Sequence, residues 1–163
     1  MESNRAPERG EILLCKFPFE EAPSKPGPAP HFCLVVESFT FKDQTWVAVA
    51  YGTSRFDLAL QKVHPVIFDV RADAIKGSEL TAPVTHILCD RLAVLPWTAQ
   101  WFKAEFRARL NRDPLDRVKS SSIKRLQDDW IHVSKKLDSN LHEALIVWMK
   151  NPKAGLITGN ALR

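Results

Sequence analysis

Short apolar runs separated by glycine and proline fill the first 96 residues of the chain. Runs of this length, rich in β-branched and aromatic residues and bounded by turn formers, are typical of β-strands. The segment 20–30 is rich in proline and cannot pair inside a sheet, because proline has no amide hydrogen to donate. We therefore expect a long, stiff loop there, of a kind that often carries function. The pattern predicts strands over residues 11–17, 31–38, 45–51, 63–69, 84–89 and 91–95.

After Pro96 the pattern changes to helical spacing. Thr98 is a suitable cap for a helix that extends to about Leu110. Asp113 followed by Pro114 is a strong start signal for a second helix, since aspartate caps and proline suits the first turn. Side chains at intervals of three and four then form one stripe on this long helix: Leu115, Val118, Ser122, Leu126, Trp130, Val133 and Leu137.

A third helix is expected from Asn140, which forms a capping pair with Glu143, to Lys150. The patterns together predict an α+β fold. Residues 1–96 form a small β domain, residues 97–151 a helical extension of about three helices, and residues 152–163 a loose tail. We expect the apolar stripe to pack on the β domain or across a dimer interface.

The charge is distributed unevenly along the chain. Residues 1–96 hold 10 Lys and Arg against 12 Asp and Glu, whereas residues 97–163 hold 13 against 7. A basic second half permits contact with nucleic-acid phosphates but does not require it, because basic helices are often only solvated. No apolar run is long enough to span a membrane, and the polar N-terminus does not resemble a secretion signal. We therefore expect a cytoplasmic protein without a membrane partner.

Cys15, Cys33 and Cys89 all lie inside apolar runs. Buried thiols in a reducing compartment explain them best. No cysteine or histidine has the spacing of a metal site, so we expect neither a metal nor another cofactor.

Candidate chemistry is weak when each residue is taken alone. Thr53-Ser54 follows a glycine at a strand end, where the hydroxyls either form a turn or bind a phosphate. Asp90-Arg91 has the composition of a surface ion pair. The histidines are scattered, and most histidines of this kind are structural.

Four segments in order nevertheless resemble the PemK/MazF family of toxins from bacterial toxin–antitoxin pairs. They are Arg9-Gly10-Glu11, the proline-rich segment with the apolar strand that follows it (Pro26 to Val36), Thr53-Ser54, and Cys89-Asp90. The resemblance covers about residues 8–96. It implies a small SH3-like β-barrel that forms a homodimer. It also implies a metal-independent endoribonuclease, in which the 2′-OH of single-stranded RNA attacks the adjacent phosphate and leaves a 2′,3′-cyclic phosphate and a 5′-OH.

The resemblance also assigns roles to individual residues. Thr53 and Ser54 would donate hydrogen bonds to the scissile phosphate, and Asp90 would be the general base. His31 stands where the family usually has an arginine that acts as acid and phosphate clamp. Histidine is able to act as an acid but carries no permanent charge at neutral pH. Leu88 occupies a second position that holds arginine in some members.

Arg55 and Arg91 are the nearest cations that could replace the missing arginines on the phosphate. The expected protein partner is a cognate antitoxin, whose acidic tail covers the active site in the family. One alternative stays open: the same domain without catalysis, acting as an RNA- or protein-binding module. Another is a structural module whose helical half is the working surface.

Overall fold

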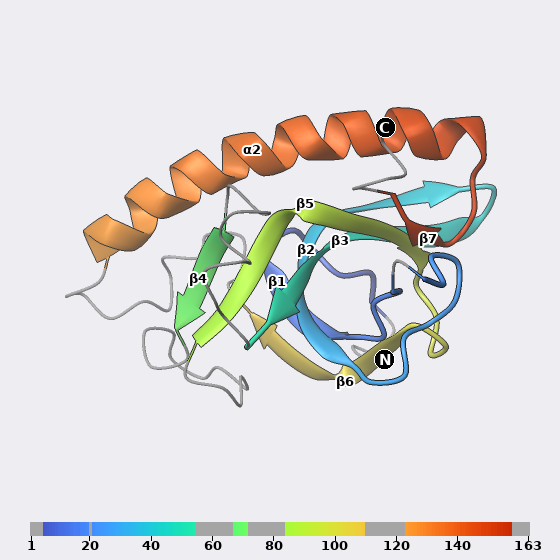
Figure 1. Cartoon of the computed structure of the whole chain (residues 1–163), viewed down its shortest axis with the longest axis horizontal. Coiled ribbons are helices and arrows are strands. Elements are labelled where there is room, and N and C mark those ends of the chain that lie inside the picture. The colour runs from blue at the N-terminus through green and yellow to red at the C-terminus, as the bar shows by residue number, and fades with distance from the viewer. Residues whose placement is uncertain (1–4, 20, 55–66, 72–83, 110–122, 158–163) are drawn as a thin grey trace.

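Seven strands and one long helix make up the described part of the chain in a computed structural model (Figure 1). The structure describes residues 5–19, 21–54, 67–71, 84–109 and 123–157. In chain order the elements are β1 (Glu11–Cys15), β2 (His31–Phe41), β3 (Gln44–Thr53), β4 (Ile67–Arg71), β5 (Val84–Pro96), β6 (Phe102–Arg109), α2 (Ile123–Lys150) and β7 (Gly155–Leu156).

All pairings in the sheet are antiparallel, and the strand order is β4-β5-β3-β2-β1-β6, with β7 paired to β5. The sheet curls, so that β5 lies beneath α2 and β6 lies on the far side (Figure 1). β2 and β3 form a hairpin whose tip residues, Lys42 and Asp43, have φ values of 49° and 64°. Two successive left-handed residues match the twist of the flanking strands and fix the register of the hairpin.

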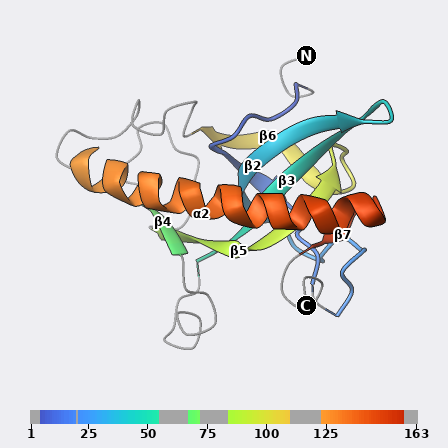
Figure 2. The same cartoon turned by 90° about the horizontal axis from the view of Figure 1, so that it is seen from above.

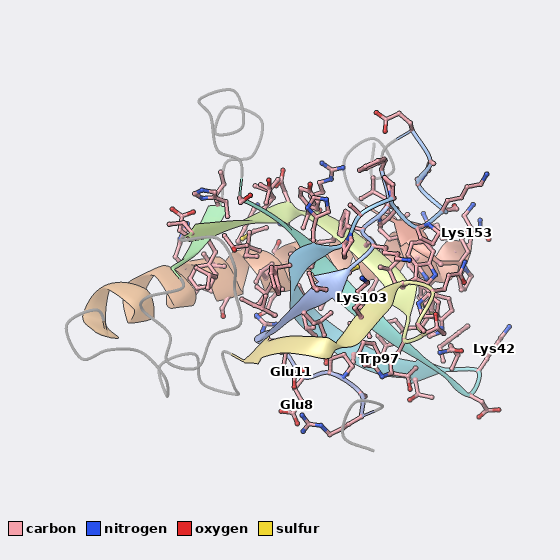
Figure 3. All side chains as sticks on the ribbon, turned by 90° about the horizontal axis from the view of Figure 1, so that it is seen from below. Glu8, Glu11, Lys42, Trp97, Lys103 and Lys153 are labelled. Atoms are coloured by element: carbon pink, nitrogen blue, oxygen red, sulfur yellow. The ribbon has the colours of Figure 1, made fainter. Side chains whose placement is uncertain are left out.

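The strands are buried on both faces, and each face has its own core. Alternate side chains of a strand point to opposite faces, so each strand contributes to both cores. The outer face packs against α2, which lies across the sheet (Figure 2). The inner, concave face is filled by residues from five strands and by Trp101 beside the start of β6. Figure 3 shows the molecule from the side opposite α2, with Trp97 and Lys103 near the start of β6.

Trp148 fixes the C-terminal half of α2 on the sheet. Its side chain is 1% exposed. Its ring packs edge-on against the rings of Phe39, Phe41 and Trp46, with ring centroids 5.1–5.3 Å apart. Its Nε1 donates a hydrogen bond to the carbonyl oxygen of Lys153 at 3.1 Å. The same side chain therefore holds the helix on the hairpin and turns the chain back towards β7.

The predicted SH3-like barrel with an extension of about three helices is wrong. The described strands form an open sheet, and one helix is present within the described ranges. The predicted helix from Thr98 to Leu110 is a single turn, in which Thr98 O accepts from Phe102 N at 3.0 Å, followed by β6. The sequence FKAEFRAR of β6 alternates apolar and charged residues with period two, which is typical of a strand, and β6 pairs with β1.

The predicted break before Asn140 is also absent, and α2 continues from Ile123 to Lys150. The apolar spacing runs through the expected break, with Leu137, Leu141 and Ala144 all buried on one stripe. Asn140 uses its side chain for a contact with the sheet rather than as a cap. The predicted start at Asp113-Pro114 lies outside the described residues.

Three further segments differ from their predicted form. The strands expected at 84–89 and 91–95 are one strand, β5, with an irregularity opposite Ala50 and Tyr51. The strand expected at 63–69 is observed from Ile67, since residues 63–66 are not described. Within the expected loose tail, Gly155–Leu156 pairs with β5. Among the described helical residues, no segment is both long and apolar enough to cross a bilayer.

Candidate active site

His31, Tyr51 and Arg91 meet on the inner face of the sheet, on three adjacent strands. The rings of His31 and Tyr51 have centroids 5.1 Å apart. The guanidinium carbon of Arg91 lies 4.6 Å from the Tyr51 ring centroid and 5.7 Å from that of Phe17. A cation over an aromatic ring at this distance is attracted by the ring quadrupole. We call His31, Tyr51, Arg91 and Phe17 the His31 cluster.

The sheet register explains why residues distant in sequence meet here. His31 begins β2 and lies opposite Cys15. Tyr51 lies opposite Leu88, while its neighbour Ala50 lies opposite Leu92. The three intervening residues of β5 therefore form a bulge, and a bulge changes the direction of a side chain. Arg91 belongs to this bulge and reaches the Tyr51 ring.

The close approach of β2 and β3 also depends on Gly52. A Cβ atom built on Gly52 would lie 1.7 Å from the backbone oxygen of Phe32. Only glycine permits two backbones to approach this closely. The contact brings the start of β2, with His31, against the end of β3, with Thr53.

The electrostatic environment favours the neutral form of the His31 imidazole. Burial, and then the positive charge of Arg91, lower the pKa of His31 from its usual value near 6.5. A histidine whose pKa lies below 6.5 is mostly unprotonated at neutral pH. It is therefore suited to accept a proton, which is the role of a general base rather than the acid role expected from the sequence.

Arg91 has a buried polar atom whose hydrogen-bonding capacity is unused. Its Nε is buried, and no partner accepts its hydrogen bond within the residues that the structure describes. An unpaired buried donor carries a desolvation cost that a ligand oxygen would remove. The planar guanidinium is also well matched to phosphate geometry. Among the residues that the structure describes, these properties make Arg91 the best candidate for a phosphate contact.

A second group of polar residues lies on the same face, beside the His31 cluster. Thr53 on β3 pairs with His86 on β5, and His86 pairs with Asp69 on β4. The Nδ1 atom of His86 lies 2.6 Å from Oδ1 of Asp69. The side chain of His86 is 12% exposed and that of Asp69 is 55% exposed. The row therefore runs from the half-buried residue Thr53 to the exposed side chain of Asp69.

The remaining predicted site residues are placed as follows. Ser54 is exposed directly after β3, and Asp90 lies half-buried in the β5 bulge. Arg55 lies outside the described residues. Leu88, at the second position where some family members have arginine, is fully buried opposite Tyr51. The structure brings His31 and Arg91 together and places Thr53 beside them.

Asp90 acts on a different neighbour. Burial first, and then the charge of Asp90, raise the pKa of the Cys89 thiol to about 12. All three cysteines are buried and free, as expected from their apolar surroundings. Burial raises the pKa of Cys15 as well, with Cys33 beside it as a second cause. Thiols held protonated in this way are poor nucleophiles.

Sequence reasoning missed Tyr51, Asp69 and His86 as site residues. The signal available was a polar residue on an otherwise apolar strand: Asp69 in IFDVR and His86 in VTHILCD. That signal alone does not show that two strands align these residues. In the described part of the chain, no three His, Cys, Asp or Glu residues group closely enough to hold a metal ion.

Comparison of the chain with protein-family models, with curated proteins and with solved structures finds no significant match. The likeness to PemK/MazF toxins therefore stays a prediction from the four sequence segments. The geometry of the inner face is the independent basis for a functional proposal.

Proposed function

We propose that this protein is a metal-independent endoribonuclease of the PemK/MazF type that cuts single-stranded RNA. The 2′-OH would attack the adjacent phosphate and leave a 2′,3′-cyclic phosphate and a 5′-OH. The observation that carries the proposal is the meeting of His31 and Arg91 at the Tyr51 ring. This reaction needs a base for the 2′-OH and a cation for the phosphate, and these two residues would supply both on one face of the sheet.

His31 is the general base in this proposal. Its lowered pKa supports a neutral imidazole that accepts the proton of the 2′-OH. We prefer it to Asp90, the base expected from the family, because His31 and Arg91 meet at the Tyr51 ring. His31 therefore lies beside Arg91, where the phosphate would bind.

Arg91 holds the phosphate and stabilises the charge that develops as the new bond forms. Its buried Nε supports this role because a phosphate oxygen would supply the acceptor that it lacks among the described residues. The Thr53 hydroxyl adds a hydrogen bond from the next position of β3 on the same face. Ser54 and Arg55 follow it in sequence and complete the set of proposed phosphate contacts.

The proposal includes the partners that the family likeness implies. One is a cognate antitoxin that covers the candidate active site, and the other is a second copy of this chain in a homodimer. A cytoplasmic location is part of the same proposal, and the three free cysteines suit its reducing conditions. Light scattering on the purified protein tests the homodimer directly.

The test is RNA cleavage in the presence of EDTA, with the new ends mapped on a long single-stranded RNA. We expect cleavage with 5′-OH ends and a loss of about 10²- to 10⁴-fold in His31→Ala, the usual contribution of a general base. Arg91→Gln should weaken cleavage as well. His142→Gln, on an exposed part of α2, is the matched control.

Equal cleavage by the wild type and His31→Ala would contradict the assignment of the base. RNA that stays intact with the wild type, yet is bound in a salt-dependent manner, would favour the alternative of a non-catalytic RNA-binding module. Growth arrest on expression is a rapid first indication, because a toxin arrests cells and a binding module does not.

A further inference from the structure

The row Thr53–His86–Asp69 has the form of an oriented proton-transfer group. Asp69 and His86 face each other across β4 and β5, and their side chains are joined at 2.6 Å. A carboxylate accepts hydrogen bonds only, so His86 Nδ1 donates to Asp69. This contact fixes the orientation of the ring. Nε2 is the ring nitrogen that would exchange a proton with a ligand.

The row is close enough to the His31 cluster to act on the same phosphate. Tyr51 and Thr53 are two residues apart on one face of β3, a rise of about 7 Å. His86 lies directly opposite Thr53 on β5. His31 lies on β2, on the other side of β3, so its backbone and that of His86 are separated by two strand spacings, about 10 Å. Two imidazoles at this spacing can bracket one phosphodiester group from opposite sides.

The reaction proposed above needs two proton transfers, and His31 supplies one of them. The base removes a proton from the 2′-OH, and an acid must protonate the departing 5′-oxygen. Thr53 lies between the two histidines in this arrangement, where its hydroxyl suits the phosphate itself. The remaining role is that of the acid. It requires a group on the β5 side of Thr53, because His31 occupies the β2 side.

We propose that His86, oriented by Asp69, is the second proton-transfer residue and donates a proton to the leaving 5′-oxygen. This inference rests on the proposed function. The O2′–P bond forms as His31 takes the 2′-OH proton, and the P–O5′ bond breaks as His86 Nε2 gives its proton to O5′. The products are a cyclic phosphate, a 5′-OH, protonated His31 and neutral His86. Proton exchange with water then restores both histidines.

A change of leaving group tests the role of His86 separately from its contribution to folding. After the cleavage site is mapped, an RNA with sulfur in place of the bridging 5′-oxygen at that site is compared with the normal RNA. A thiolate leaves without protonation, so this RNA does not need an acid. The variants are His86→Gln, Asp69→Asn and His31→Ala. The matched control is His132→Gln, at an exposed position of α2.

We expect His86→Gln to lower kcat for normal RNA by about 10²- to 10⁴-fold and to cleave the sulfur-containing RNA nearly as fast as the wild type. Asp69→Asn, which changes a positioning residue, should give a smaller loss with the same rescue. His31→Ala should stay slow on both substrates. Rescue of His86→Gln by sulfur is a result that a merely structural role would not give.

Two results overturn the inference, and they are distinguishable from each other. If the wild type cleaves RNA and His86→Gln is equally fast, or is slow on both substrates while still folded by circular dichroism, His86 is not the acid and the proposed function stands. If the wild type cleaves neither RNA, the proposed function fails and the inference fails with it.

Discussion

The Nδ2 atom of Asn140 on α2 donates a hydrogen bond of 2.7 Å to the carbonyl oxygen of Cys89 on β5. Cys89 is the first residue of the bulge that ends with Arg91. The bulge leaves backbone groups without a partner in the ladder, and this bond satisfies one of them. The helix on the outer face therefore helps to hold the backbone that presents Arg91 on the inner face.

Asn140→Ala should lower the free energy of unfolding by about 1–3 kcal/mol, because it leaves a buried carbonyl without its donor. If the bulge relaxes as well, cleavage should also fall. Urea denaturation monitored by circular dichroism measures the first effect. The neighbouring exposed Ser139→Ala is the control, with a change within about 0.5 kcal/mol. Equal stability of Asn140→Ala and the wild type would show that the bulge does not need the helix.

Trp148→Ala should destabilise the protein by about 3–5 kcal/mol, since it removes a buried ring that contacts three other aromatic residues. The same denaturation measurement applies. Met149, the next residue, is 56% exposed, so Met149→Ala should change stability by no more than about 0.5 kcal/mol. Similar losses in the two variants would mean that α2 is not held by the Trp148 side chain.

Gly52→Ala should destabilise the protein by at least about 2 kcal/mol, because its Cβ would overlap the backbone oxygen of Phe32. The neighbour in the overlap is backbone, so it cannot rotate away. Ser54→Ala, two residues further on and exposed, is the control. Thermal unfolding compares the two, and an unchanged midpoint in Gly52→Ala would contradict the close approach of β2 and β3.

Arg91→Gln should raise the pKa of His31, since the positive charge of Arg91 is one of the two causes that lower it. The titration of the imidazole Cε1–H by NMR measures this directly. In the wild type we expect a midpoint below 6.5, and in Arg91→Gln a midpoint closer to 6.5. Lys103→Gln, an exposed lysine on β6, is a control for the loss of any positive charge. A wild-type midpoint above 6.5 would contradict the half-buried position of His31.

The same shift makes stability depend on pH. Because the folded-state pKa of His31 is lowered, the unfolded chain binds more protons between that pKa and 6.5. The contribution of His31 is therefore fully present above 6.5 and is lost as the pH falls through 6.5 towards the folded pKa. Denaturation at pH 7.5 and at pH 5 should show a smaller loss for His31→Gln than for the wild type. An equal loss in both would indicate that His31 titrates normally in the folded state.

The chain's own pattern was sufficient for the local character of the first 96 residues. Alternating and continuous apolar runs predicted the strands around β1, β2, β3 and β5, and the prolines of segment 20–30 predicted a connection without strand pairing. Cysteines in apolar runs predicted buried thiols. These features depend on side-chain period and backbone chemistry, which a single segment carries in itself.

Local signals were misleading where two of them competed. Thr98 suggested a helix start, but the period-two alternation of FKAEFRAR suits a strand, and pairing with β1 gave it a partner. Asn140 suggested a cap, yet its side chain bonds to Cys89 and α2 continues past it. In both cases a partner distant in sequence decided the structure. Helix propensity is a property of the local sequence and carries no information about such a partner.

The candidate site divides in the same way. From the sequence, the family likeness suggested His31 and Thr53, and Arg91 was suggested only as a cation next to Asp90. Tyr51, Asp69 and His86 became site residues only through the register of β3, β4 and β5. Chain order fixes which residues occupy a strand. Hydrogen-bond pairing between strands, together with the bulge in β5, decides which side chains lie next to each other, and that pairing exists only in the folded sheet.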